Sequence, residues 1–175
     1  MIALITGAKG GLGTFVTRAF LDAGAQVFGT SRSIRKEDFP HPAFTAIPAE
    51  LTNLEAAQTL VASLPRIDVA VHLLGAYEGG TAVADTDASV LDRMLDLNLR
   101  SAFFLAKAVL PGMRAQGSGR FLAIASRSAV EPVALSGAYN LSKAALVSLV
   151  KTIAIENADR GIPANVVLPA TMDTP

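Results

Sequence analysis

A tyrosine and a lysine lie four residues apart in the stretch SGAYNLSKAAL, as Tyr139 and Lys143. Positions four apart share one face of an α-helix, so the two side chains would project together. A phenol is a weak acid, and an ammonium group beside it stabilises the phenolate, which makes proton exchange with an alcohol or a carbonyl feasible. Taken alone, the pair fits a surface contact at least as well as an acid–base centre.

Two further polar residues could complete such a centre. Ser126 ends the apolar run RFLAIAS, thirteen residues before Tyr139. That position is the carboxyl end of a predicted strand, where parallel sheets bind their ligands. Asn98 interrupts the helical run LDLNLRS, where an asparagine is either tolerated or functional. The candidate catalytic residues are therefore Asn98, Ser126, Tyr139 and Lys143.

A glycine-rich loop, TGAKGGLG, joins the first apolar run to a helical pattern. Gly7 allows a tight turn, Gly11 lets the backbone approach a pyrophosphate, and Gly13 lets the helix pack closely on the sheet. The helix N-terminus then offers N–H groups and a positive dipole end to phosphates. An ordinary turn and an ATPase phosphate loop are the alternatives, but Thr14-Phe15 stands where the ATPase loop needs a lysine and a hydroxyl residue.

The segment GTSRSIRK after the second apolar run bears on the choice of dinucleotide. An acidic residue there binds the adenosine ribose of NAD, whereas an arginine accommodates the 2′-phosphate of NADP. This segment has no acid and offers Ser31 and Arg32 instead. It predicts a preference for NADP(H), with NAD(H) possible, although a solvated charged loop would look the same. Glu50, after the third run, could contact the adenine or cap the following turn.

The elements that must position these residues alternate along the chain. Apolar runs predict six strands, and helical patterns lie between them. The strands are expected at Ile2–Thr6, Ala25–Thr30, Phe44–Pro48, Asp68–Gly75, Arg120–Ser126 and Ala164–Pro169, and the helices at 12–23, 53–64, 89–116 (with a kink or break at Pro111) and 137–157. Such alternation predicts a Rossmann-type, doubly wound α/β fold with a parallel sheet, in a single domain over residues 1–175.

Composition excludes several classes of protein. The chain has 15 basic and 15 acidic residues, so its charge gives no reason to expect nucleic acid or a membrane as partner. It has no cysteine, which excludes disulfides and thiolate metal sites, and we expect no metal. No apolar run is long enough to span a bilayer, and the N-terminus does not resemble a secretory signal. We expect a cytoplasmic protein.

In this order and spacing, the glycine loop, Asn98, Ser126, Tyr139 and Lys143 make the chain resemble the short-chain dehydrogenase/reductase family over essentially its whole length. The resemblance implies that Tyr139 donates and accepts the proton, and that Lys143 holds the nicotinamide ribose and stabilises the phenolate. Ser126 would bind the substrate oxygen, and Asn98 would help to hold a water in a proton relay. The substrate would be a small carbonyl compound or alcohol. A non-catalytic, redox-sensing NAD(P)-binding module is the main alternative.

The resemblance also implies a set of cofactor contacts. Thr174, in the closing run LPATMDTP, matches a threonine that contacts the nicotinamide carboxamide. The full expected set is Gly7, Lys9, Gly11, Leu12, Gly13, Ser31, Arg32, Glu50, Leu51, Gly75, Asn98, Tyr139, Lys143, Pro169, Thr171 and Thr174.

The chain departs from the family pattern at several places. The family's Asn-Asn-Ala-Gly segment is HLLG here, so His72 takes an asparagine position, and we expect a core histidine there rather than a catalytic one. The family's cation before the second glycine is displaced by one position, to Lys9, and its Pro-Gly pair is Pro169-Ala170. Family members continue beyond this length, so we expect the C-terminal strand and the substrate lid to be missing.

Two of the predicted helices are apolar on more than one face, near residues 102–110 and 144–155. Packing on a sheet needs only one apolar stripe. The surplus predicts a homodimer or homotetramer that assembles through these helices, as the resemblance also implies. Burial under a missing C-terminal segment is the alternative.

Overall fold

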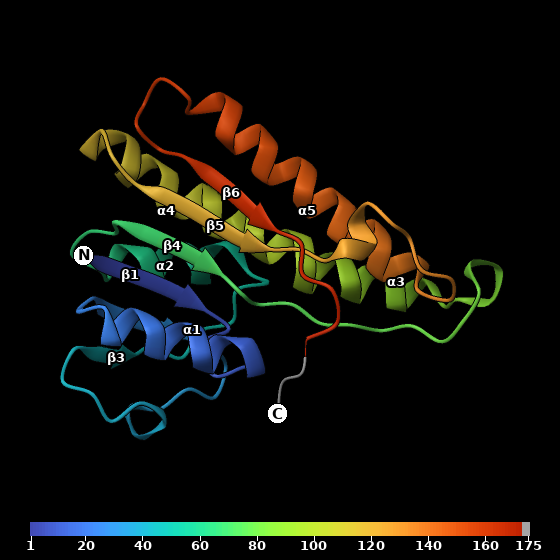
Figure 1. The fold of residues 1–175 in the computed structure, drawn as a ribbon, viewed down its shortest axis with the longest axis horizontal. Helices are drawn as coiled ribbons and strands as arrows, with labels where there is room; N and C mark the ends of the chain where they lie inside the picture. Colours follow the sequence, from blue (N-terminus) through green and yellow to red (C-terminus); the bar gives the residue numbers. More distant parts are fainter. Residues whose placement is uncertain (173–175) are drawn as a thin grey trace.

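Six strands form one parallel sheet in the computed structural model, which describes residues 1–172 (Figure 1). The strand order is β3-β2-β1-β4-β5-β6, and every neighbouring pair is parallel. The strands are β1 (Ile2–Thr6), β2 (Gln26–Thr30), β3 (Phe44–Ala46), β4 (Val69–His72), β5 (Arg120–Ile124) and β6 (Ala164–Val167). This is the predicted doubly wound arrangement, with strands slightly shorter than the apolar runs.

Helices connect the strands in the predicted order. The α-helices are α1 (Gly11–Asp22), α2 (Leu54–Ala62), α3 (Ala88–Leu95), α4 (Ser101–Gln116) and α5 (Gly137–Glu156). A π-helical segment, η3 (Asp96–Arg100), joins α3 to α4, and short 3₁₀ turns lie at η1 (Lys36–Asp38), η2 (Val83–Asp85) and η4 (Arg127–Ala129). None of the helices in the described part of the chain is both long and apolar enough to cross a membrane.

The long helical pattern after β4 differs from its prediction in two ways. It contains the widened π turn, which sequence periodicity did not indicate. We expected a kink or a break at Pro111: the break is wrong, because α4 continues through this residue, and the kink stays a prediction. Pro111 lies on the exposed side of the helix, while Leu110 and Met113 on either side are buried and keep the helix on the core.

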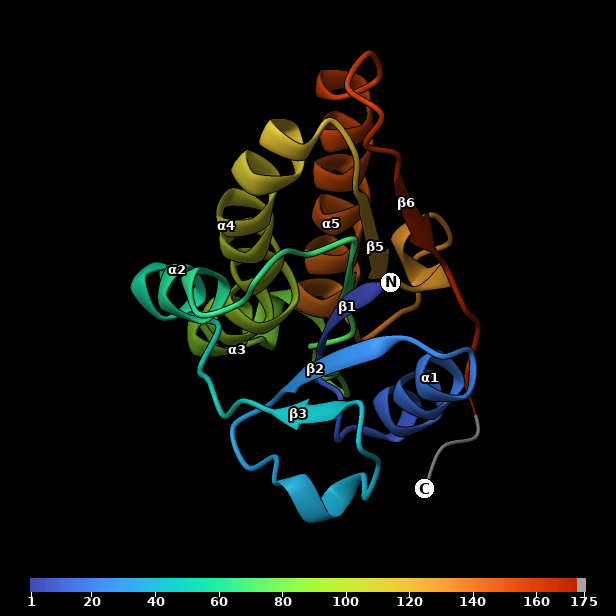
Figure 2. The same ribbon diagram turned by 90° about the vertical axis from the view of Figure 1, so that its left-hand side faces the viewer.

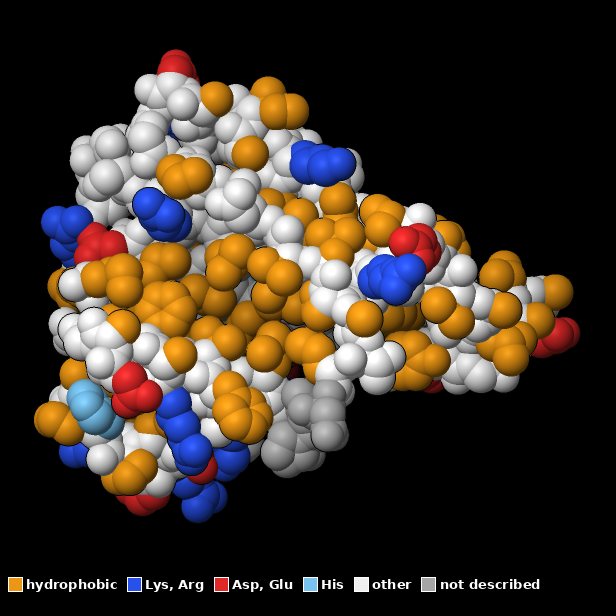
Figure 3. All heavy atoms as spheres, in the orientation of Figure 1, with side chains coloured by type: hydrophobic (Ala, Val, Ile, Leu, Met, Phe, Trp, Pro, Cys, Tyr) orange, Lys and Arg blue, Asp and Glu red, His pale blue; other side chains and the backbone are white. Residues whose placement is uncertain are grey.

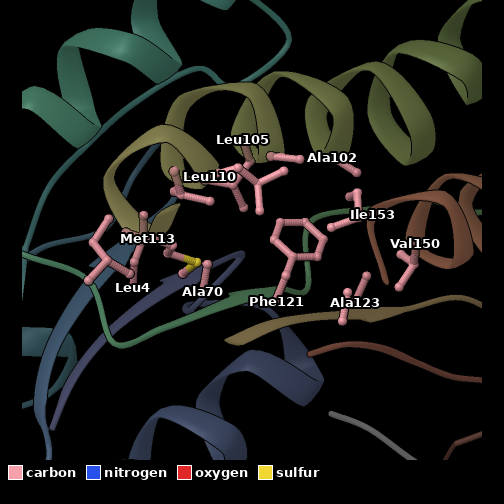
Figure 4. Packing of buried hydrophobic residues seen from close by; sticks show 14 of the residues in the cluster. Leu4, Ala70, Ala102, Leu105, Leu110, Met113, Phe121, Ala123, Val150 and Ile153 are labelled. Atoms are coloured by element: carbon pink, nitrogen blue, oxygen red, sulfur yellow. The ribbon is translucent and has the colours of Figure 1, made fainter. Parts of the chain in front are cut away.

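The two faces of the sheet carry separate cores. Helices α2, α4 and α5 cover one face, and α1 covers the other (Figure 2). The larger core centres on Phe121 of β5, which packs among side chains of α4 and α5 (Figure 4). Burying an aromatic side chain of this size contributes roughly 2–3 kcal/mol. This core fixes the start of α5, where Tyr139 and Lys143 lie, relative to the strand that ends before Ser126.

The two halves of the sheet are covered differently. Strands β1, β2 and β4 are buried on both faces along nearly their whole length, whereas β5 alternates between buried and partly exposed residues. Helix α1 contacts β1 and β2, and Val167 of β6 is 48% exposed. Apolar side chains accordingly gather near the middle of the face seen in Figure 3.

The strand order reverses between β1 and β4. The chain leaves β1 toward β2 on one side and leaves β4 toward β5 on the other, so the loops after these two strands diverge. Doubly wound sheets bind their ligands in the crevice at this point. The glycine loop follows β1 and the segment with Gly75 follows β4, so both candidate binding segments border this crevice.

Candidate active site

The glycine loop adopts a conformation that depends on the absence of side chains. Gly7 has φ +66°, and a Cβ there would lie 2.9 Å from the backbone of Leu73 and Leu74. A Cβ on Gly13 would overlap the carbonyl oxygen of Gly7. These two glycines therefore let the loop pass tightly between β4 and α1, as the motif predicted.

The N-terminus of α1 is open to a ligand. Gly10 occupies the N-cap and no side chain caps the first turn, which contains Gly11 and Leu12. Unpaired N–H groups at such a terminus bind phosphate oxygens. A pocket of about 440 Å³ lies beside it, lined by residues that include Gly7, Lys9, Ser31, Arg32, Glu50 and Gly75. Together with Leu51, these six residues make up seven of the sixteen predicted cofactor contacts.

The chemistry of this pocket fits a dinucleotide. The Ser31 hydroxyl is buried and has no hydrogen-bond partner within residues 1–172, which leaves it available to a ligand. Lys9 forms an ion pair with Asp38 at 3.0 Å and donates a hydrogen bond to the carbonyl of Ser33. Hydrogen bonding to the Arg35 N–H and to Lys9 holds the pKa of Asp38 below its usual value.

Glu50 was expected either to contact the adenine or to cap the following turn, and in the structure it caps the turn. Its carboxylate accepts hydrogen bonds from the N–H and the hydroxyl of Thr52. Leu51 next to it is buried, at 2% exposure, and it lines the same pocket. The Glu50 carboxylate thus hydrogen-bonds within its own turn, and its contact with the adenine stays a prediction.

Lys143 is buried at the junction of β4, β5 and α5. Only 6% of the residue is exposed, and its Nζ donates a hydrogen bond of 3.1 Å to the carbonyl of Ile124. Burial lowers the pKa of Lys143 to about 8, because the charged form loses hydration. The ammonium lies 5.9 Å from the centre of the Tyr139 ring. A buried cation beside a phenol is the arrangement that an acid–base tyrosine needs.

Asn98 is fully buried in the π-helical segment and ties it to the segment after β4 and to α5. Its side chain accepts a hydrogen bond from the Ala76 N–H and donates to the Ala76 carbonyl and to Ser142 of α5. A Cβ on Gly75 would lie 2.7 Å from the Asn98 oxygen and 3.1 Å from the Lys143 nitrogen. Gly75 is therefore the residue that lets these two polar groups approach the segment after β4.

Ser126 is polarised by a serine that the sequence did not single out. The hydroxyl of Ser126 accepts two hydrogen bonds from Ser128, one from its N–H at 3.2 Å and one from its hydroxyl at 3.0 Å. A hydroxyl has two acceptor sites and one proton. With both acceptor sites used, Ser126 can act toward a substrate oxygen as a donor. The feature of the sequence that could have identified Ser128 is its position two residues after Ser126.

His72 belongs to a buried hydrogen-bond chain, as expected for a core residue. The Leu73 N–H donates to the Thr6 hydroxyl, Thr6 contacts His72 Nδ1 at 3.0 Å, and His72 Nε2 contacts Ser101 at 3.3 Å. The Ser101 hydroxyl donates its proton to the Leu97 carbonyl, so toward His72 it must accept a hydrogen bond. The histidine proton is therefore assigned to Nε2. Burial, followed by the charge of Lys143, lowers the pKa of His72 to about 3, so the ring stays neutral.

Tyr139 opens into a second pocket, of about 660 Å³. Its lining combines hydroxyl groups with apolar side chains, and includes Tyr77, Ser126, Ser128, Tyr139, Thr171 and Met172. Pro169 supports one wall, because its carbonyl accepts a hydrogen bond from the Arg127 N–H. Thr174 lies outside the described residues. The predicted catalytic residues thus converge at the carboxyl ends of β4 and β5, beside the dinucleotide pocket.

Comparison with known proteins agrees with this geometry. Residues 1–175 match the family described as short chain dehydrogenase. The chain belongs to this family. It is 32% identical over 177 residues to "Dehydrogenase/reductase SDR family member 6" of Xenopus laevis, covering 99% of this chain and 72% of the relative. The family consists of NAD(P)-dependent dehydrogenases and reductases.

Solved structures of the same family superpose closely. A short-chain dehydrogenase from Streptomyces avermitilis has a TM-score of 0.91 at 31% identity, and the match covers 99% of this chain and 66% of that chain. "ElxO with NADP Bound" has a TM-score of 0.93 at 27% identity, covering 99% of this chain and 74% of that chain. The chain thus spans about two thirds to three quarters of the length of the relatives that it matches.

Proposed function

We propose that this short-chain dehydrogenase prefers NADP(H) and transfers hydride between the nicotinamide and a small carbonyl compound or alcohol. The observation that carries the proposal is the convergence of Asn98, Ser126, Tyr139 and Lys143 beside the glycine-loop pocket. Bound NADP(H) supplies the hydride chemistry. Residues 1–175 act in this proposal as one nucleotide-binding domain that also carries the catalytic groups, and a cytoplasmic location stays a prediction.

The protein's own residues handle the proton. The Tyr139 hydroxyl gives its proton to the substrate oxygen during reduction and takes it back during oxidation. The Lys143 ammonium stabilises the phenolate left behind, and Ser126 donates a hydrogen bond to the same substrate oxygen. Asn98 holds the segment after β4 and the start of α5 in place. A water held near Asn98 would return protons from the solvent.

The preference for NADP(H) rests on charge at the end of β2. Lys9 and Arg32 line the pocket there, and the Ser31 hydroxyl has no partner among the described residues. A 2′-phosphate can take hydrogen bonds from all three. Asp38 lies against Lys9 and holds it in place. A solved relative whose title names NADP as bound supports the same preference.

Assembly through α4 and α5 is part of the proposal. Phe103 of α4 is 50% exposed, and Leu141 and Ile155 of α5 are 53% and 78% exposed. Two copies that pair through these faces would bury this apolar surface in a homodimer or homotetramer. Sedimentation equilibrium of the wild type and of Phe103→Glu tests the interface: the variant shifts toward monomer, and an unshifted mass contradicts it.

The test of the reaction uses a labelled cofactor. NADPH or NADH carrying deuterium at C4 is mixed with the full chain and a panel of ketones, aldehydes, quinones and pterins. The proposal predicts an alcohol product with deuterium on the former carbonyl carbon. Tight binding of NADP(H) without turnover of any panel member favours the redox-sensing module instead. Tighter binding of NADH than of NADPH contradicts the cofactor preference.

A further inference from the structure

Tyr77 is an exposed aromatic residue in the pocket of Tyr139, and the reaction described above gives it no role. It lies two residues after Gly75, on the segment that follows β4. Tyr77 is 67% exposed, yet its ring packs edge-on against the ring of Tyr139, with 5.0 Å between centroids and 78° between planes. The ring is therefore held on one side by the proposed acid–base residue itself.

The hydroxyl of Tyr77 is held as well. It lies 3.1 Å from the hydroxyl of Ser136, a residue that is 4% exposed and directly precedes α5. Gly79 makes room for this contact, because a Cβ there would lie 2.5 Å from the Tyr77 oxygen. The Gly80 N–H also donates a 2.7 Å hydrogen bond to the carbonyl of Leu135. These contacts fasten the segment of Tyr77 to the segment before α5.

The Tyr77 ring is held by its contact with Tyr139 and at its hydroxyl, yet the residue is still 67% exposed. It therefore forms a preorganised contact surface. Tyrosine offers a large flat area with few rotatable bonds, so little conformational entropy is lost on binding. Tyr77 lines the pocket of about 660 Å³. A group attached to the reacting carbon can therefore reach it while the substrate oxygen contacts Tyr139.

The remainder of the pocket does not demand a charged substrate. Arg127 and Glu131, the two charged residues in its lining, form an ion pair with each other and hydrogen-bond at 2.7 Å. Val133 and Met172 add apolar surface. The two charges offset each other, so a neutral, flat group matches this lining.

We propose that Tyr77 is a specificity-determining residue that selects carbonyl or alcohol substrates with an aromatic ring next to the reacting carbon. The selection works through stacking or edge contact between that ring and Tyr77, which aromatic pairs prefer. This rests on the proposed function, because it places the substrate oxygen at Tyr139. It concerns binding, so it can be tested without turnover.

The experiment compares two alcohols of similar size, benzyl alcohol and cyclohexylmethanol. Calorimetry measures their binding to the full chain saturated with NADPH, a complex in which an alcohol cannot be oxidised. The wild type should bind benzyl alcohol about two- to tenfold more tightly. Tyr77→Leu should remove this preference, whereas Tyr77→Phe, which keeps the ring but loses its contact with Ser136, should retain part of it. The NADPH Kd of each variant reports whether the fold is intact.

Gly79→Ala provides a second variant if Tyr77→Leu is unstable. Its new methyl group displaces the Tyr77 hydroxyl, so the preference should fall while the Tyr77 ring is still present. An equal preference in wild type and Tyr77→Leu overturns the proposal, as does the absence of measurable binding of either alcohol. A wild type that binds benzyl alcohol preferentially but reduces no carbonyl contradicts the proposed reaction and leaves the role of Tyr77 standing.

Discussion

The two halves of the sheet perform their tasks by different means. In the half formed by β1 to β3, the binding surface is mainly backbone: glycines bring the chain close to the helix N-terminus, and no side chain caps that helix. In the half formed by β4 to β6, side chains do the corresponding work, through a buried lysine, a buried asparagine and a pair of serines. We call the first half the nucleotide half and the second the catalytic half. Added atoms should therefore be most harmful at the glycines of the nucleotide half, and lost polar groups should be most harmful to activity in the catalytic half.

Burial also differs around the two pockets. Strands β1, β2 and β4, which border the glycine-loop pocket, are buried along nearly their whole length, while β5 and β6 contain partly exposed or exposed residues. A pocket that opens beside the less covered strands can admit substrates of varied shape. The pocket at the glycine loop borders fully buried strands, which suits a cofactor of constant shape. Four substitutions test this contrast, taken from the largest expected effect to the smallest.

Of these four substitutions, adding one methyl group at Gly13 should have the largest effect. The new Cβ of Gly13→Ala would overlap the Gly7 carbonyl, so α1 must shift away from the loop. We expect the NADPH affinity to fall at least about 100-fold, or the chain to lose several kcal/mol of stability. Gly112→Ala in α4 is the matched control, because nothing lies within 4 Å of its new Cβ. It should be neutral or stabilising by up to about 1 kcal/mol.

Lys143→Met should separate stability from activity. Burial lowers the pKa of Lys143 from 10.5 to about 8, so at pH 7 the charge is a net penalty on folding. We expect the free energy of unfolding at pH 7 to rise by on the order of 1–3 kcal/mol, while kcat falls at least about 100-fold. Denaturant unfolding and steady-state kinetics measure the two effects.

The stability gain of Lys143→Met should depend on pH, because burial lowers the pKa of Lys143 in the folded chain. Below pH 8 the lysine is charged in both folded and unfolded chains, so the full penalty is present. Between pH 8 and 10.5 the folded chain loses the proton first, so stability rises with pH. The advantage of Lys143→Met should therefore shrink across this window. A gain that is constant from pH 7 to 10.5 would refute burial as the cause.

Arg32→Asp tests the charged end of the nucleotide half. A carboxylate there repels the 2′-phosphate and can accept hydrogen bonds from the ribose of NADH. We expect the NADPH Kd to rise about tenfold or more and the NADH Kd to change little or fall. Fluorescence titration with both nucleotides measures the ratio. Equal losses for both nucleotides would mean that Arg32 supports the loop rather than the phosphate.

Ser128→Ala should have the smallest of these effects. It removes one of the two hydrogen bonds that Ser126 accepts, and the backbone N–H still supplies the other. We expect kcat to fall about three- to tenfold with little change in the NADPH Kd. Ser128→Thr keeps the hydroxyl and should restore most of the rate. A rate that is unaffected in Ser128→Ala would show that Ser126 needs no polarisation.

The fold and the main site residues could be predicted because their signals are local. The parallel α/β architecture follows from the alternation of apolar runs with helical patterns, and the shared helix face of Tyr139 and Lys143 follows from helical periodicity. Gly7 and Gly13 were predictable for the same reason, since Gly7 has the positive φ of a tight turn and a Cβ on Gly13 would meet the backbone of Gly7 and Ala8 in the same loop.

Other features depend on contacts between distant segments. The hydrogen bond from Tyr77 to Ser136 spans 59 positions, and that from Asn98 to Ser142 spans 44. No periodicity in the sequence indicates either contact. The π turn that carries Asn98 was missed because one extra residue in a helical turn barely alters an apolar pattern. Of the kink or break expected at Pro111, the break does not occur, because buried neighbours outweigh the local preference of proline.

Tyr139→Phe tests the central claim most directly, because it removes one oxygen atom from the catalytic half. Two quantities are measured on the same preparation: the NADPH Kd by fluorescence titration, and kcat with the best carbonyl substrate of the panel. The account predicts a Kd within about twofold of the wild type and a kcat at least about 1000-fold lower. A variant that retains a tenth or more of the wild-type kcat would contradict the assignment of Tyr139 as the acid–base residue.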